Sequence, residues 1–392
     1  MNAGLILLTL SYVFSQFFRS FLAVMAEVLE RDLGALPDDL ALASGIWFLV
    51  FAAMQIPVGW ALDQVGPRRT SALLFLVGGA GGAAGFALAQ SPTHVVWAMG
   101  LIGLGCSPVL MAAYYTFARM YRPAVFASLA ATVLGVGTLG NLAGTVPLTL
   151  LVEAIGWRET LWALAAATAV IATALFFTVQ DPPKVETEQR GSVLDILRMP
   201  ALWLIFPMMF ANYAASGGLR AVWIGPYLRD VQGMTPNAVG IATLIMGVAM
   251  IAGTFAYGPL DRLLGTRKWV ILPGNLVVVL GCAALWLWPA PGPAAAVVLF
   301  CVVGAFGMTF PLVLAHGRSF VPAHLAGRGV TLMNLFGIAG VGIFQVITGR
   351  VQSAATSAGA PLAESYGPVF AVFAVVTLAG LLPYIFSRDR LD

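Results

Sequence analysis

Apolar residues run almost without interruption along this chain, broken at intervals by short groups of charges, prolines and glycines. A helix needs about 20 mostly apolar residues to cross a bilayer. The runs do not alternate between apolar and polar residues, which argues against the strands of a membrane β-barrel. The predicted spans are 4–28, 40–62, 70–90, 94–118, 125–152, 159–179, 201–227, 237–259, 269–288, 294–317, 328–349 and 367–386. The pattern predicts an all-α integral membrane protein with twelve transmembrane helices.

Composition agrees with this class. Of the 392 residues, 60% are hydrophobic and 9% are charged, whereas an average soluble protein is about 25% charged. A soluble enzyme and a disordered scaffold are excluded, and a net charge of +3 without a basic face excludes a nucleic-acid partner. The three cysteines (Cys106, Cys282, Cys301) are widely spaced in apolar runs with no histidine nearby. No disulfide framework, zinc site or cofactor is therefore predicted.

The distribution of basic residues sets the orientation. The first apolar run has no basic leader and continues for about a full span, so a cleavable signal peptide is not expected. With the N-terminus in the cytoplasm, fourteen of the twenty Lys and Arg residues fall on the cytoplasmic side, four fall on the other side, and Arg19 and Arg220 lie inside spans. This bias predicts an inner-membrane protein with both termini in the cytoplasm.

The chain also repeats itself. A polar stretch at 181–200 reads as a cytoplasmic linker between six-helix halves at 1–180 and 201–392. Asp63 and Asp261, which follow the second span of each half, are 198 residues apart, and the intramembrane arginines are 201 apart. A duplicated unit with parallel repeats is typical of one large transporter fold.

The loop that contains the first of these aspartates carries a glycine-rich, basic motif of the form G-x-x-x-D-x-x-G-x-R-[RK], made by Gly59, Asp63, Gly66, Arg68 and Arg69. Its second copy has the same length but carries the aspartate one position earlier, and comprises Gly258, Asp261, Gly265, Arg267 and Lys268. With this motif the whole chain resembles the major facilitator superfamily. The resemblance implies a monomeric secondary transporter that moves a small solute by alternating access, with the loop motifs acting as a cytoplasmic gate. The alternative is that these charges only anchor the loops at lipid headgroups.

Polar side chains within the spans are the candidates for binding the solute. A charge inside a membrane costs at least about 2.5–3.5 kcal/mol, which singles out Arg19 and Arg220. Tyr12, Gln16 and Arg19 share one helix face, as do Asn212, Ser216 and Arg220. Arg19 could instead have a structural partner, and Arg220 could extend to the headgroups. The predicted substrate-binding residues are Arg19, Tyr12, Gln16, Gln55, Tyr114, Tyr115, Asn141, Asn212, Tyr213, Ser216, Arg220 and Asn334.

Other features bear on the substrate. Sulfur ligands suit Cu(I), and a copper pathway would use Met246, Met250, Met209 and Cys106; core packing is the alternative. No Asp or Glu lies near the middle of a span. Coupling of transport to protons would therefore depend on Glu27 or His316, and uniport without a coupling ion is the alternative. In span 5, the glycines predict close helix packing and Pro147 predicts a kink. The G-P pair that is typical of drug antiporters in the superfamily is missing from this span, which disfavours a drug antiporter.

Three segments sharpen the resemblance: Phe17–Val24, Ala52–Asp63 and Gly218–Leu228. They are similar to a proteobacterial cluster of the superfamily that contains a riboflavin importer and a copper importer of haem-copper oxidase assembly. This implies import of a small organic solute such as riboflavin. Copper import and export of an organic anion or drug are the alternatives. The expected partners are the transported solute and membrane lipid.

Overall fold

The computed structural model describes residues 3–120, 123–182, 193–322 and 325–391, except the side chains of residues 63, 118, 123–128, 130, 131, 193 and 326–328. Within these residues every regular element is a helix. Ten helical segments are long and apolar enough to cross a membrane, and two bent helix pairs raise the number to twelve. The predicted all-α, twelve-helix fold is confirmed.

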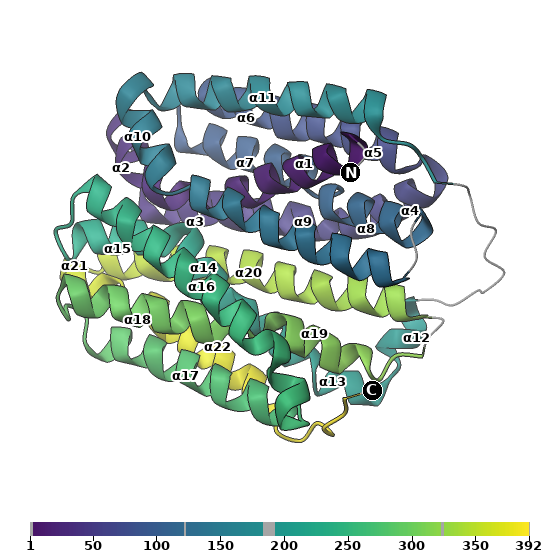
Figure 1. Cartoon of the computed structure of the whole chain (residues 1–392). Coiled ribbons are helices and arrows are strands. Elements are labelled where there is room, and N and C mark those ends of the chain that lie inside the picture. Colours follow the sequence, from purple (N-terminus) through teal and green to yellow (C-terminus); the bar gives the residue numbers. More distant parts are fainter. Residues whose placement is uncertain (1–2, 121–122, 183–192, 323–324, 392) are drawn as a thin grey trace. The chain divides into compact units, whose positions relative to one another are not determined.

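The chain divides into two compact units, Met1–Glu186 and Thr187–Asp392 (Figure 1). Of the predicted linker, residues 183–192 lie outside the described residues. A short helix, α12 (Val193–Leu197), falls within the rest of it.

In the N-terminal unit, α3 packs on α7, α1 packs on α9, and α11 packs on α6. Its elements are α1 (Ala3–Ser20), α2 (Leu22–Leu33), α3 (Pro37–Ala53), α4 (Gln55–Gln64), α5 (Pro67–Leu74), the π-helix η1 (Phe75–Ala80), α6 (Gly81–Ala87), α7 (Pro92–Cys106), α8 (Val109–Met120), α9 (Pro123–Ala143), α10 (Val146–Ile155) and α11 (Trp157–Thr178).

Two spans of this unit are bent. Helices α1 and α2 meet at 53° at Phe21, and the first span continues to Leu33, beyond its predicted end. The fifth span bends by 44° between α9 and α10, just before Pro147, where a kink is predicted. A Cβ at Gly140 of α9 would collide with the backbone carbonyl of Val13 on α1. The predicted close helix packing is therefore present between α9 and α1, and it holds α1 in place.

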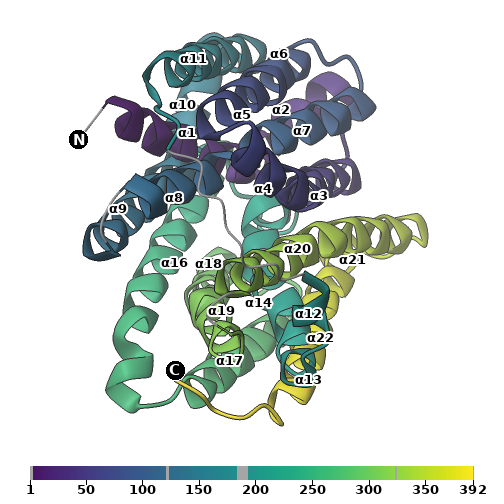
Figure 2. The same ribbon diagram turned by 90° about the vertical axis from the view of Figure 1, so that its right-hand side faces the viewer.

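In the C-terminal unit, α14 packs on both α20 and α22, α17 on α22, and α16 on α18 (Figure 2). After α12, the elements of this unit are α13 (Pro200–Trp203), α14 (Phe206–Gly218), the π-helix η2 (Leu219–Trp223), α15 (Ile224–Asp230), α16 (Pro236–Leu264), α17 (Lys268–Leu287), α18 (Pro293–Phe306), the 3₁₀-helix η3 (Gly307–Thr309), α19 (Phe310–Arg318), α20 (Ala326–Ser357), α21 (Leu362–Ser365) and α22 (Gly367–Tyr384).

Many helices begin at a proline because a helix's first turn has no use for the missing N–H. At α7, Ser91 precedes Pro92 and its hydroxyl accepts the His94 N–H at 3.4 Å. At α16, Thr235 precedes Pro236 and caps the Ala238 N–H in the same way. Local sequence thus sets where several spans start, and packing sets how they bend.

Candidate functional site

One face of α1 carries three of the predicted substrate-binding residues. Gln16 Nε2 donates a hydrogen bond to the Tyr12 hydroxyl at 3.0 Å, and both side chains are buried. Gln16 Oε1 is buried without a hydrogen-bond partner among the described residues. Helix α8 packs on α1, and the side chain of its Tyr114 is close enough to that of Tyr12 for the two to interact electrostatically. The structure thus brings Tyr12, Gln16 and Tyr114 together in the N-terminal unit.

Arg19, the third residue on this face, lies among aromatic rings of α3. Its Cζ is 5.2 Å from the ring centroid of Trp47, 5.5 Å from that of Phe51 and 5.8 Å from that of Phe48. Trp47 stacks on Phe51 with centroids 5.1 Å apart. The faces of such rings attract a cation, so they hold the guanidinium without an acid.

Polar groups at this cluster remain unsatisfied. Arg19 Nε and Trp47 Nε1 are buried and make no hydrogen bond within the described residues, where Arg19 also has no carboxylate partner. Arg19 itself is half-buried. A cation inside a span without a counter-charge is costly unless a ligand provides one. Sequence reasoning missed the rings as a set, although the spacing of Trp47, Phe48 and Phe51 places them on adjoining helix positions.

Arg220 lies in the first span of the C-terminal unit, within the π-helix η2. It is 4% exposed, and its guanidinium lies against Gly247 of α16, where an added Cβ would be 3.0 Å from Nη2. The arginine is therefore enclosed by its own unit, unlike a side chain that extends to lipid headgroups. Short π segments frequently occur at functional sites.

Asn212 forms a buried polar network with other helices of its unit. Its Nδ2 donates to Asn275 Oδ1 at 2.7 Å and to Thr309 Oγ1 at 2.6 Å, which ties α14 to α17 and η3. Ser216 packs against Gly307. The ring of Tyr213 lies 5.6 Å from that of Phe310, centroid to centroid.

The other predicted residues are spread over both units. Gln55 Nε2 donates to the Phe51 carbonyl at 3.1 Å and to that of Ser107 at 3.5 Å. Asn141 on α9 and Asn334 on α20 are half-buried. Tyr115 lines a cavity beside the first loop motif, and Tyr12, Gln16 and Arg19 do not line it.

The sulfur residues of the copper alternative lie in packed surroundings. Met246 and Met250 of α16 both pack against Gly304 of α18, and Met209 packs against Gly337. Cys106 is buried in the N-terminal unit. Among the described residues no group of three or more His, Cys, Asp or Glu side chains could hold a metal ion. Helix packing accounts for the Met-x-x-x-Met spacing.

The first loop motif is organised by Asp181, which follows α11. Its Oδ1 accepts the Arg68 N–H at 2.8 Å at the start of α5, and its Oδ2 is 3.6 Å from Arg68 Nε. Gly66 has φ +98°, and a Cβ there would be 2.6 Å from Asp181 Oδ1, so this position requires glycine. Arg69 is exposed and Gly59 is half-buried in α4. The side chain of Asp63 lies outside the described residues.

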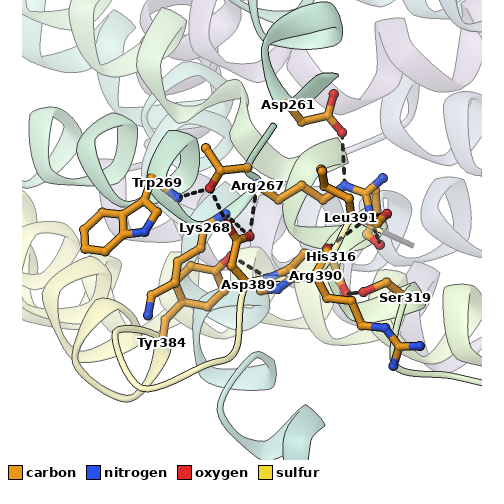
Figure 3. Close-up of polar contacts among 12 residues, drawn as sticks. Asp261, Arg267, Lys268, Trp269, His316, Ser319, Tyr384, Asp389, Arg390 and Leu391 are labelled. Carbon is orange, nitrogen blue, oxygen red and sulfur yellow. Dashed lines mark hydrogen bonds and ion pairs between the residues drawn. The ribbon is translucent and has the colours of Figure 1, made fainter. Parts of the chain in front are cut away.

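The second motif is organised by Asp389, which follows α22 (Figure 3). Asp389 accepts the Arg267 N–H at 3.1 Å, the Lys268 N–H at 3.0 Å and the Thr266 hydroxyl. Burial alone raises the pKa of the Asp389 carboxyl, but these hydrogen bonds outweigh burial and hold the pKa below its ordinary value. Asp389 thus caps α17 as Asp181 caps α5.

The predicted residues of the second motif occupy matching places. Asp261 accepts the Arg267 Nε–H at 3.0 Å, Gly265 ends α16 with φ +65°, and Gly258 is exposed. Asp181 and Asp389 were missed by sequence reasoning. Each is the first acid after the last span of its half, so a comparison of the two halves would have found them.

The C-terminal tail, with Asp389, Arg390 and Leu391, lies in the same region (Figure 3). Lys268 Nζ donates to the Ser387 carbonyl at 3.0 Å. The two ring nitrogens of His316 contact the Tyr384 hydroxyl at 2.6 Å and the Arg388 carbonyl at 2.9 Å. Glu27, the other proton-coupling candidate, is exposed on α2.

Sequence comparison finds related transporters. Residues 8–345 match the model of the Major Facilitator Superfamily. The putative transporter AraJ of Escherichia coli (strain K12) is 26% identical over 196 residues, which is 48% of this chain and 47% of that protein. The match thus spans about half the length of AraJ. The probable sulfoacetate transporter SauU of Cupriavidus necator is 23% identical over 359 residues, 85% of this chain and 83% of that protein.

Solved structures share the fold. A bacterial homologue of the human lysosomal transporter Spinster, in an inward-facing and unoccupied conformation, has a TM-score of 0.80 at 16% identity, with 98% of this chain and 96% of that chain covered. The D-xylose-proton symporter gives 0.77 at 16% identity, with 98% of each chain covered. The nucleoside transporter NupG (D323A mutant) gives 0.76 at 17% identity, with 98% and 100% covered. With its twelve-helix fold and its family match, the chain belongs to the Major Facilitator Superfamily and is a secondary transporter of small solutes, not an enzyme.

Proposed function

We propose that this transporter moves a small organic solute whose anionic or carbonyl group is bound by Arg19. The observation that carries the proposal is the arginine itself: its cation is held by three aromatic rings, and within the described residues no acid neutralises it. A solute with an acceptor group would satisfy Arg19 Nε. The rings of Trp47 and Phe51 are buried, and they fix the guanidinium in place for such an acceptor.

Two solute classes fit these requirements. Riboflavin, the leading candidate from the sequence, combines a planar ring system with carbonyl acceptors. Small organic anions are the second class, because an uncompensated cation favours a full negative charge. SauU is named as a probable transporter of sulfoacetate, which is such an anion. The methionines of the copper alternative are accounted for by packing, so copper is not part of the proposal.

The wider account follows the family. The solute is imported across the inner membrane by alternating access, by a monomer with both termini in the cytoplasm. The two loop motifs act as the gate, and Asp181 and Asp389 fix the start of the helix that follows each motif. Gating by the motifs is supported by their duplication and by the matching carboxylate caps.

Uptake measurements test the proposal. Cells that express the protein would be given radiolabelled riboflavin or a labelled small carboxylate or sulfonate, with the other compounds as competitors. We expect saturable uptake of one class, lost in Arg19→Gln. Arg350→Gln is the matched control, because Arg350 is exposed. If folded protein is present in the membrane and neither class is taken up, the proposed substrates are wrong. If uptake is unchanged in Arg19→Gln, Arg19 does not bind the solute.

A further inference from the structure

The arginines of the two loop motifs have different surroundings. In the second motif, Arg267 Nη1 donates to the carbonyls of Ala315 at 3.3 Å, Arg390 at 3.5 Å and Leu391, in addition to the Asp261 pair (Figure 3). Backbone oxygens of α19 and of the C-terminal tail therefore satisfy this guanidinium.

The first motif lacks such acceptors within the described residues. Arg68 Nε is buried and has no hydrogen-bond acceptor there, since Asp181 Oδ2 at 3.6 Å pairs with it by charge alone. Cζ of this guanidinium also lies 5.4 Å from the ring centroid of Phe176. A cavity of about 420 Å³ adjoins the arginine, and its wall includes Gly66, Pro67, Arg68, Arg69, Tyr115 and Asp181.

The cavity has a positive wall. Among the described side chains, Arg68 and Arg69 line it, and the guanidinium of Arg119 lies 4.3 Å from the ring centroid of the lining residue Tyr115. Of the acids whose side chains are described, Asp181 is the one that lines it, and it is already engaged by the Arg68 N–H at the start of α5. The N-terminus of that helix is therefore capped, and the side chains of Arg68 and Arg69 are the cationic groups that line the cavity.

Guanidinium groups bind phosphate oxygens through paired N–H donors. We propose that this cavity binds a phosphate group, carried either by the headgroup of an anionic lipid or by a small soluble phosphate ester. A phosphate oxygen supplies to Arg68 the acceptor that the C-terminal tail supplies to Arg267. The cavity lies between α4 and α5, where two membrane-spanning segments end and lipid headgroups are available. Its volume accommodates a glycerophosphate.

The test uses the full-length protein in lipid nanodiscs and measures its thermal midpoint. One arm compares phosphatidylcholine discs with discs that also contain phosphatidylglycerol. The other arm adds sn-glycerol 3-phosphate to phosphatidylcholine discs. We expect a rise in the midpoint in at least one arm, and an apparent affinity about fivefold weaker in Arg69→Gln, the size expected for loss of one basic contact to an anionic headgroup.

The variants keep the test decisive. Arg69 is exposed and makes no polar contact with the described residues, so its loss does not endanger folding. Arg68→Gln adds a second measurement, and Arg262→Gln, an exposed arginine beside the second motif, is the matched control. A response to phosphatidylglycerol alone identifies a lipid site, and a response to glycerol phosphate identifies a soluble ligand. No response in either arm, or equal responses in wild type and Arg69→Gln, overturns the proposal.

Discussion

Arg19 and Arg220 each lie in the first span of their half, 201 residues apart, and both lie where that span departs from regular α-helix. Their surroundings differ. Arg19 lies just before the bend at Phe21 and faces three rings, whereas Arg220 lies in a π segment with its guanidinium against Gly247. Each half thus carries an arginine in its first span, but in a different environment. This difference is the basis for our proposal that Arg19 binds an acceptor of the solute, whereas Arg220 is enclosed by its own unit.

The largest effect is expected from removing each charge. Arg19→Gln should lower uptake at least about tenfold while the thermal midpoint of the purified protein stays the same or rises, because a charge inside a span without a counter-charge is lost. Arg220→Gln should lower uptake and also the thermal midpoint. The loss of a packed, buried side chain should reduce the free energy of unfolding by about 1–3 kcal/mol. Uptake normalised to protein in the membrane, together with scanning fluorimetry, measures both. Equal effects of the two substitutions on stability would contradict the proposed difference between Arg19 and Arg220.

The loop motifs provide the next contrast. Asp389 accepts hydrogen bonds from Thr266, Arg267 and Lys268, whereas Asp181 accepts one backbone N–H. Asp389→Ala should therefore cost about 2 kcal/mol and Asp181→Ala about 1 kcal/mol, within the usual range for helix caps.

Thermal midpoints in detergent would measure the difference between the two caps. Glu153→Ala serves as a control, because Glu153 is an exposed acid. A larger loss from Asp181→Ala than from Asp389→Ala would contradict the ranking.

A smaller effect is expected at the contact that encloses Arg220. In Gly247→Ala, the new Cβ would lie 3.0 Å from Arg220 Nη2, so the guanidinium must shift by a few tenths of an ångström. Uptake should fall several-fold, and stability should fall by about 1 kcal/mol. Gly85→Ala on α6, where nothing lies within 4 Å of the added Cβ, should instead be neutral or stabilising. If Gly247→Ala behaves like Gly85→Ala, the enclosure of Arg220 has no role.

The smallest effect concerns pH. The pKa of Asp389 is lowered by folding, so its contribution is fully present above the pKa of an unfolded aspartate, about 4. That contribution is lost as pH falls through the lower pKa of the folded state. The stability difference between wild type and Asp389→Asn should be constant at neutral pH and shrink below about pH 4. A difference that grows on acidification would contradict this sign.

Much of the fold could be predicted because bilayer thickness fixes the length of a span. The loop motifs were visible for a similar reason: glycines and charges stand out in an apolar chain. The bend at Phe21 could not be predicted, since neither Pro nor Gly marks it. The caps by Asp181 and Asp389 depend on how the chain returns after the last helix of each half, which tertiary packing decides.

The candidate site was predictable only in part. Arg19, Tyr12 and Gln16 were found because their spacing places them on one face of a helix. The rings around Arg19 come from another helix, α3, and which face of α3 meets α1 is decided by packing. Asn212 was predicted from its polarity and from the helix face that it shares with Ser216 and Arg220, but its hydrogen bonds to Asn275 and Thr309 lie inside its own unit.

Ligand binding to purified protein tests the central claim most directly, because it separates recognition from flux. Thermal midpoints of wild type and Arg19→Gln would be compared across riboflavin and a series of small carboxylates and sulfonates. A ligand at about one hundred times its Kd stabilises a protein by about 2.7 kcal/mol. The account predicts that at least one of these solutes raises the midpoint of the wild type and leaves that of Arg19→Gln unchanged. An equal rise in both proteins would contradict it.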